Sequence, residues 1–243
     1  MKFFITFMCC IVSVAVARKL PSFIEVCHPK RVDVGECVKK NLEILRPKFR
    51  QGIPELQIPA FNPLKLSSAD IKLGENFKTN LKNIKLWFSN SFSIEEFKVD
   101  LDHFRLEFTI KFPEVKAQGD YSINGKLLIL NLDGAGLGKI FLHNLTATVV
   151  ASGKKEKKNG KEYIVPTNVD IKPEVQSMNI HLENLFPSNP ELTEQANKLF
   201  NDNQKVLFED FSPLIVNLVK KLISNYINNF FSRYSYDVLF PDD

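Results

Sequence analysis

The chain has 243 residues, of which 44% are hydrophobic and 25% charged, with only 10 glycines. This composition excludes disordered, collagen-like and disulfide-dense proteins, and the length fits one large domain or two smaller ones. The formal net charge is only +4, from 32 basic and 28 acidic residues, which argues against a nucleic-acid-binding protein. Phenylalanine is frequent, with 21 copies against one tryptophan and five tyrosines, so the fold must enclose or line much aromatic surface.

Residues 1–17 have the features of a secretory signal peptide. Lys2 supplies a positive charge, an apolar run of about fourteen residues follows, and Ala15-Val16-Ala17 matches a small-x-small cleavage pattern. A membrane-anchoring helix is the alternative, but the run is short for a bilayer and ends at Arg18 and Lys19. We therefore predict a secreted, extracellular protein without a transmembrane segment, whose mature chain begins near Arg18.

Two cysteines remain after the signal peptide is removed, Cys27 and Cys37. In an oxidising compartment, two cysteines ten residues apart most simply form one disulfide. A metal site would need two further soft ligands, which the neighbouring His28 alone does not supply. The one Asn-x-Ser/Thr sequence, Asn144-Leu145-Thr146, is a candidate glycosylation site and fits an extracellular chain.

The mature chain is predicted to begin with a short amphipathic helix over residues 34–46, where apolar residues recur at helical spacing. Asp33 is its N-cap candidate, Glu36 follows three residues later, and Pro47 marks its end. Residues 52–64 place three prolines among apolar residues. Because proline cannot donate a hydrogen bond to a neighbouring strand, we expect an extended edge or wrapping segment rather than a central strand.

From about residue 70 to 182 the sequence predicts a long antiparallel series of strands. Residues 104–112 alternate apolar and polar side chains, the period of a strand with one dry face. The alternation changes phase near Asp102-His103, which predicts a bulge or bend. No alternation of strands with helices appears, which argues against a parallel sheet. Three dipeptides are turn signals: Asn124-Gly125, Asp133-Gly134 and Asn159-Gly160.

The last fifty residues are predicted to be helical. Apolar residues recur every three or four positions from Leu207 to Phe231, and a helix from Asn203 to Ser232 would be about 45 Å long. Pro213 should kink this helix or mark a restart capped by Ser212. A helix with so wide an apolar face needs an equally long groove, and the predicted sheet is the surface available to form it.

No catalytic or cofactor motif is recognised. A Gly-x-Ser-x-Gly motif is absent, and the four histidines lack metal-ligand spacing. The glycine-rich segment from Gly134 to Lys139 fits neither the Walker nor the dinucleotide pattern, so we predict a β-turn there. The lysine-rich run at 154–158 is interpreted as a hydrated loop, with docking to a membrane or an anion as the alternative. We therefore predict a protein that is not an enzyme and that uses no cofactor or metal ion.

Four short segments, taken with the order of the elements, resemble a known family. They are Gly52 to Leu56, Asn62 to Leu64, Gly134 to Ile140 and Tyr236 to Pro241. Together with the signal peptide, the cysteine pair, the β region and the terminal helix, they resemble the insect takeout and juvenile-hormone-binding protein family over residues 22–241. One departure is Gln204, at a position where relatives commonly carry tryptophan.

This resemblance implies an α+β fold: a single elongated domain, residues 18–243, in which a long C-terminal α-helix is wrapped by a strongly curved antiparallel β-sheet. Such a fold is similar to the TULIP superfamily of lipid-binding proteins. The resemblance also implies an internal apolar tunnel beside the helix. We accordingly expect a monomeric secreted carrier of a small lipophilic ligand, such as a terpenoid hormone, a fatty acid or a semiochemical.

Residues on the predicted strand and helix should line the tunnel, although each could instead be ordinary core. The apolar candidates are Trp87, Phe104, Leu106, Phe108, Ile110, Phe112, Phe211, Leu214, Leu218 and Leu222. The candidates to hold a polar ligand group are Tyr121, Tyr163 and Tyr226. Two rival functions are an interaction module with a filled core that binds a receptor or partner protein, and a secreted esterase, which the missing serine motif disfavours.

Overall fold

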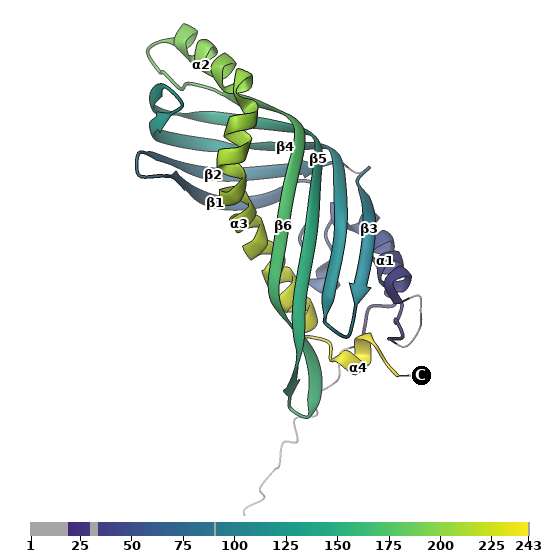
Figure 1. Ribbon diagram of the computed structural model, residues 1–243. Helices are drawn as coiled ribbons and strands as arrows, with labels where there is room; N and C mark the ends of the chain where they lie inside the picture. The colour runs from purple at the N-terminus through teal and green to yellow at the C-terminus, as the bar shows by residue number, and fades with distance from the viewer. Residues whose placement is uncertain (1–18, 30–33, 90, 243) are drawn as a thin grey trace, which may run out of the picture.

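Within residues 19–29, 34–89 and 91–242, which the computed structural model describes, six strands form one antiparallel sheet curled around a long helix (Figure 1). The strands are β1 (Leu64–Leu73), β2 (Phe77–Phe88), β3 (Ser93–Asp100), β4 (Arg105–Leu127), β5 (Leu130–Lys158) and β6 (Lys161–Leu182). The helices are α1 (Val34–Leu45), α2 (Pro190–Asp202), α3 (Gln204–Phe231) and α4 (Tyr236–Leu239). The predicted α+β fold is confirmed. The predicted signal peptide, residues 1–17, and the N-cap candidate Asp33 lie outside the described residues.

Strand β4 organises the sheet because it pairs with three other strands. The order is β1-β2-β4-β5-β6, and β3 pairs with β4 as well. β2 pairs along one half of β4, as far as Phe88 opposite Val115. β3 pairs along the other half, where Ser93 lies opposite Lys111. The strands β2 and β3 therefore share one edge of β4, one beyond the other.

Two of the three predicted turns are wrong. Asn124-Gly125 and Asp133-Gly134 lie inside strands, where they face each other across β4 and β5. The chain reverses instead at Leu128-Ile129, where Leu128 has a positive φ of 53° and Ile129 is 77% exposed. Gly125 is needed for a close approach: a Cβ there would lie 1.9 Å from the carbonyl oxygen of Asn76. The third turn, Asn159-Gly160, is confirmed at the tip of the β5–β6 hairpin.

The β-turn predicted from Gly134 to Lys139 is also wrong, because this segment is part of β5. Its glycines make room for the chain that follows β6. A Cβ on Gly134 would lie 2.4 Å from the carbonyl oxygen of Leu185, and one on Gly136 would lie 2.1 Å from that of Glu183. Residues 183–185 can thus lie flat on the strand because β5 has no side chains at these two positions.

The phase change near Asp102-His103 marks a hairpin turn rather than a bulge within one strand. β3 ends at Asp100, which pairs with Arg105 at the start of β4, and residues 101–104 form the turn. A register shift does occur, but within β3, between Glu95 and Lys98. Phe104 therefore belongs to the turn, with a positive φ of 48°, and not to the strand predicted for it.

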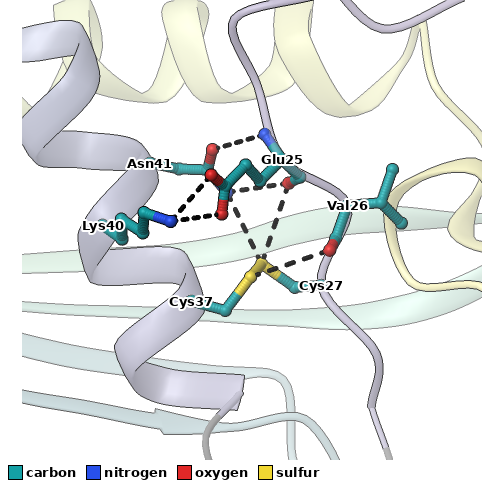
Figure 2. The surroundings of a disulfide bond; sticks show 6 residues. All are labelled: Glu25, Val26, Cys27, Cys37, Lys40 and Asn41. Atoms are coloured by element: carbon teal, nitrogen blue, oxygen red, sulfur yellow. Dashed lines mark hydrogen bonds and ion pairs between the residues drawn. A yellow bond between two sulfur atoms is a disulfide. The ribbon is translucent and has the colours of Figure 1, made fainter.

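The N-terminal helix is confirmed as α1, and a 3-10 helix, η1 (Arg46–Arg50), continues directly from it. The predicted disulfide between Cys27 and Cys37 is present and ties the preceding segment to α1 (Figure 2). Beside it, the Asn41 side chain accepts a hydrogen bond from the Glu25 backbone N–H and donates one to the Glu25 carbonyl, both at 2.8 Å. A single side-chain amide thus satisfies both backbone groups of one residue in an irregular segment.

Residues 52–64 wrap one end of the molecule, but they are less extended than predicted. A second 3-10 helix, η2 (Pro54–Leu56), interrupts the segment, and Ile53 forms an isolated bridge to Ile58. Ile53 and Leu56 are almost completely buried. Pro54 therefore begins a tight local turn, and the segment is not extended over its whole length.

Helices α2 and α3 are separated by Asn203 alone. The Asn189 side chain caps α2 by accepting a hydrogen bond from the Leu192 N–H at 3.0 Å. Pro213 lies inside α3, which continues past it to Phe231, so the predicted restart capped by Ser212 is wrong. The long C-terminal helix of the prediction corresponds to α3, with ends one residue inside those expected.

An amide ladder, formed by Asn197, Asn201 and Gln204, joins the helices to the edge of β6. Asn201 Oδ1 accepts from the Ile180 N–H at 2.8 Å and its Nδ2 donates to the Ile180 carbonyl at 2.9 Å. Asn197 makes the same two bonds to Leu182, and Gln204 accepts from the Met178 N–H. The four residues from Asn197 to Asn201 rise about 6 Å, close to the rise of about 6.7 Å for two strand residues. The three residues from Asn201 to Gln204 rise about 4.5 Å, and the longer glutamine side chain reaches the next alternate residue of β6.

Two separate groups of buried residues lie toward opposite ends of α3. The upper core, at the α2 end, consists of Phe77, Tyr121, Ile123, Leu127, Leu132, Met178, Leu185, Ala196, Phe200 and Leu207. The lower core, at the α4 end, consists of Leu45, Ile53, Leu56, Tyr234 and Leu239. The long middle part of α3 belongs to neither core, and this part positions the candidate site.

Candidate ligand-binding site

Helix α3 lies between the two edges of the curled sheet, packing mainly on β6 and also touching β1 (Figure 1). A hydrogen-bonded ion pair from Lys220 Nζ to Asp170 Oδ1, 2.8 Å long, fastens the middle of the helix to β6. The Lys220 ammonium group lowers the pKa of the Asp170 carboxyl below its ordinary value, and a hydrogen bond from Asn168 adds to this. The helix therefore lies across the open side of the sheet, and the region between its middle part and the sheet is the candidate site.

The predicted strand face is apolar and is the candidate wall of this region on the side of the sheet. The side chains of Leu106, Phe108, Ile110 and Phe112 alternate along β4, and their partners on β5 are all apolar or small: Ala151, Val149, Ala147 and Leu145. Phe104, predicted to continue this face, lies in the turn, where its ring contacts that of Tyr236 at a centroid distance of 6.1 Å. The structure thus keeps four of the five predicted residues together on the strand.

A chain of five phenylalanine rings, the aromatic row, crosses the molecule beside this wall. Its members are Phe49, Phe61, Phe88, Phe112 and Phe92, with successive ring centroids 5.4, 6.4, 5.3 and 5.5 Å apart. Phe49 comes from η1, Phe61 from the segment before β1, and Phe92 from just before β3. Phe112 was predicted from the alternation of residues 104–112, whereas the other four were missed because no regular strand or helix spacing relates them. All five are half-buried.

The apolar stripe of α3 is the candidate wall on the side of the helix. Leu214, Leu218 and Leu222 continue, at spacings of three or four residues, the stripe that begins with Leu207 and Phe211. Leu207 is 2% exposed and is the one buried residue of α3. Phe211 packs on the upper core, where its ring lies 5.5 Å from that of Phe77. Beyond it, the apolar residues of the helix are only half-buried or exposed.

Both walls of the middle section are therefore apolar and incompletely buried, whereas the cores at the two ends are tightly filled. In a closely packed interior, side chains of this size would be almost fully buried. The strand residues and the helix residues both keep part of their surface exposed. The arrangement suits an apolar guest molecule, which would cover both walls at once.

The other predicted site residues lie apart from this region. Trp87 pairs with Lys116, which pairs in turn with Phe141, so these three share one face of the sheet. Leu86, on the opposite face, pairs with Ala117 and through it with Ile140, which packs on the upper core. Trp87 consequently points away from the region beside α3, and we leave it out of the proposed lining.

Of the three tyrosines predicted to hold a polar ligand group, Tyr121 lies in the upper core and is 5% exposed. Its hydroxyl donates a 2.6 Å hydrogen bond to the Glu183 carbonyl, and burial raises its pKa to about 12. This hydroxyl therefore secures the segment after β6. Tyr163 on β6 and Tyr226 on α3 are half-buried.

Replacing Tyr121 by phenylalanine should change how stability depends on pH. The folded protein holds this proton to about pH 12, whereas an unfolded tyrosine loses it near pH 10. The contribution of the protonated Tyr121 hydroxyl to the free energy of unfolding is complete below about pH 10. It declines, by at most about 1.4 kcal/mol per pH unit, as the pH rises toward 12. Tyr121→Phe should cost about 1 kcal/mol at neutral pH. Denaturant unfolding of both proteins between pH 8 and 11 should show their difference shrinking, and a constant difference would contradict the assignment.

The predicted glycosylation residue, Asn144, is exposed on β5, where its amide donates a hydrogen bond to the Gln176 side chain. Among the described residues, no three His, Cys, Asp or Glu side chains gather in a way that could hold a metal ion. Within the same part of the chain, no helix is both long and apolar enough to span a membrane.

Comparisons with known proteins agree with this architecture. The family model for haemolymph juvenile hormone binding proteins matches residues 5–241. The circadian clock-controlled protein daywake of Drosophila melanogaster is 27% identical over 218 residues, which cover 85% of this chain and 84% of that protein. Its Drosophila yakuba counterpart is 25% identical over 235 residues, or 92% and 89% of the two chains.

The crystal structure of Takeout 1 from Epiphyas postvittana has the same fold. It superposes with a TM-score of 0.76 at 24% identity, covering 87% of this chain and 97% of that one. Because the family model spans nearly the whole sequence, it settles the resemblance first drawn from the four short motifs. The chain belongs to the haemolymph juvenile hormone binding protein family.

Proposed function

We propose that this protein is a secreted carrier of a small lipophilic ligand, which lies between the middle of α3 and the strand face of β4. The observation that carries the proposal is the incomplete burial of both apolar walls between two tightly packed cores. Family membership supports a binding role. The sequence of residues 1–17 and the disulfide between Cys27 and Cys37 support secretion.

Transfer of the ligand out of water provides the affinity. A terpenoid or fatty ligand of about fifteen carbons gains at most about 12 kcal/mol, at about 0.8 kcal/mol per buried CH₂ group. Association and side-chain ordering cost several kcal/mol, which leaves a micromolar to nanomolar Kd. Half-buried phenylalanine rings suit such a ligand because they offer apolar surface without competing polar groups. In this proposal the protein keeps the ligand in solution and away from enzymes and surfaces.

Ligand retention is the direct test. Native mass spectrometry of the purified protein should detect a co-purifying lipophilic molecule, and a fluorescent fatty probe should bind saturably with one-to-one stoichiometry. If neither is seen, the carrier proposal is contradicted, and the protein is better described as an interaction module with a filled core. Turnover of an ester substrate by the pure protein would contradict the non-enzymatic part of the proposal.

A pair of matched substitutions tests whether the middle section has free space. Leu207→Phe adds volume to the packed upper core and should cost about 1–3 kcal/mol of unfolding free energy. Leu218→Phe adds the same volume to the same helical stripe, where the side chain is only half-buried, and should cost less than about 0.5 kcal/mol. The Leu218 variant should nevertheless bind the fatty probe several-fold more weakly. Equal destabilisation of the two variants would show that the middle section is filled.

A further inference from the structure

The edge of β4 has a seam where β2 gives way to β3. β2 pairs with β4 up to Val115, β3 pairs with it from Lys111, and residues 112–114 fall between these two registers. One described backbone hydrogen bond crosses this stretch, from the Ser89 N–H to the Glu114 carbonyl at 3.0 Å. Pro113 has no N–H to donate. The sheet is therefore held together less tightly at the seam than along either neighbouring ladder.

A groove of about 500 Å³ lies at this seam. Its lining combines aromatic, cationic and amide side chains: Asn62, Trp87, Phe88, Ser89, Glu114, Lys116, Ala117, Gln118, Lys139 and Phe141. Trp87, Lys116 and Phe141 form one row across three strands, and the Lys116 ammonium lies 5.6 Å from the centre of the Phe141 ring. A volume of this size is within the range of small-molecule sites.

Two ammonium groups of the lining, those of Lys116 and Lys139, can pair with an acidic group. Each of them now pairs with a carboxylate of the protein. Lys116 Nζ lies 3.3 Å from Glu114 Oε1, and Lys139 Nζ lies 3.1 Å from Glu183 Oε1. All four side chains are more than one-third exposed, so these surface pairs are weak and can be exchanged for a ligand carboxylate.

Phe88 connects the groove to the candidate interior. Phe88 is one of the residues that line the groove, and its ring contacts Phe112 and Phe61 in the aromatic row. Phe88 is the last residue of β2, where the ladder to β4 ends, so few backbone bonds restrain it. One aromatic side chain thus stands between an amphipathic surface groove and the half-buried rings beside α3.

From these observations we propose that the seam groove is the entrance for the ligand and the site that holds its head group. The ligand class is a fatty or terpenoid acid, whose carboxylate pairs with Lys116 and Lys139 while its tail passes Phe88 toward the aromatic row. This inference rests on the proposed carrier function and adds a head-group preference and a route of entry to it.

The only tryptophan of the chain lines the groove, so its fluorescence reports on this site alone. Titration with dodecanoic acid should change the emission of Trp87, with a Kd about tenfold lower than that of dodecanol. The double variant Lys116→Gln/Lys139→Gln should raise the Kd for dodecanoic acid about tenfold and leave the Kd for dodecanol unchanged. Lys72 is an exposed lysine near the β1–β2 turn. The substitution Lys72→Gln is the matched control and should leave the Kd of both ligands unchanged.

Association kinetics test the role of Phe88. Phe88→Ala should speed the association of both ligands several-fold in stopped-flow fluorescence, because the side chain that separates groove and interior is removed. Three results would each overturn the entrance proposal. They are an equal change in Kd for acid and alcohol in the lysine variant, no change in Trp87 emission on ligand binding, and an unchanged association rate in Phe88→Ala. If such results came with one-to-one retention of the fatty probe, the carrier function would stand, whereas failure of the probe to bind would reject both.

Discussion

Replacing Gly136 by alanine is expected to lower the free energy of unfolding by about 3 kcal/mol. A Cβ at this position would lie 2.1 Å from the carbonyl oxygen of Glu183, whereas ordinary contacts begin at about 3.4 Å. The obstacle is backbone, so it cannot move aside as a flexible side chain would. Denaturant unfolding followed by circular dichroism would measure the loss.

The segment that would have to move is held in place from three directions. The Glu183 N–H donates to the Leu137 carbonyl at 3.0 Å, Asn184 Nδ2 donates to the Ala135 carbonyl at 2.9 Å, and the Tyr121 hydroxyl donates to Glu183 at 2.6 Å. Leu185, the next residue, is completely buried in the upper core. A shift that relieved the clash would weaken these hydrogen bonds and open the end of the interior nearest α2.

Gly138→Ala is the matched control in the same strand. The nearest atom to its Cβ would be the end of the Leu182 side chain, at 3.0 Å, which a small rotation can displace. We expect a cost below about 1 kcal/mol. If the two variants lost similar unfolding free energy, any side chain in this part of β5 would be destabilising. The explanation based on the close approach of residues 183–185 would then be wrong.

Replacing Asn201 by alanine should cost about 2 kcal/mol, because it leaves both backbone groups of Ile180 without their protein partners at the covered edge of β6. The amide ladder is the main polar connection between the helices and the sheet. Its loss should loosen the start of α3 as well, and hydrogen exchange at the Ile180 amide should accelerate. The unfolding free energy and the exchange rate are the two measurements.

Two further variants distinguish the effect of the lost hydrogen bonds on stability from the effect of a changed helix propensity. Gln195→Ala, at an exposed position of the same helix, should change stability by less than about 0.5 kcal/mol. Asn201→Asp keeps the acceptor for the Ile180 N–H but sets a carboxylate against the Ile180 carbonyl, so it should be as destabilising as alanine near pH 7. Because a protonated carboxyl can donate again, part of its loss should be recovered below about pH 4. No recovery would contradict the proposed pairing.

Gln204 has a structural role that the sequence did not predict. Relatives commonly carry tryptophan at this position, so the sequence predicted only the loss of an aromatic contact. In the structure its side chain accepts from the Met178 N–H and extends the ladder by one step. Asn197, Asn201 and Gln204 follow the i, i+4, i+7 spacing of one helical face. The pattern was therefore visible in the sequence, but hydrophobic periodicity does not search for polar stripes.

Two of the three glycine-containing dipeptides predicted turns that the folded chain does not form. Asn124-Gly125 and Asp133-Gly134 have the composition of turns, yet both serve close packing between segments distant in the sequence. The real turn, Leu128-Ile129, has no turn residue at all. Local turn chemistry is a weak guide when a glycine is selected by a neighbouring backbone, because that neighbour cannot be identified before the chain is folded.

The amino-acid sequence by itself determined the secretory signal pattern, the Cys27–Cys37 pairing, the antiparallel class and the long amphipathic helix, because all of these depend on composition or on spacing within one segment. Only the tertiary structure decided that β2 and β3 meet at a seam on β4, that five phenylalanines from unrelated segments form one row, and that Trp87 lies on the opposite face. Periodicity reports which side of a strand or helix avoids water. It does not report whether the space on that side is filled, because filling depends on how segments far apart in the chain meet.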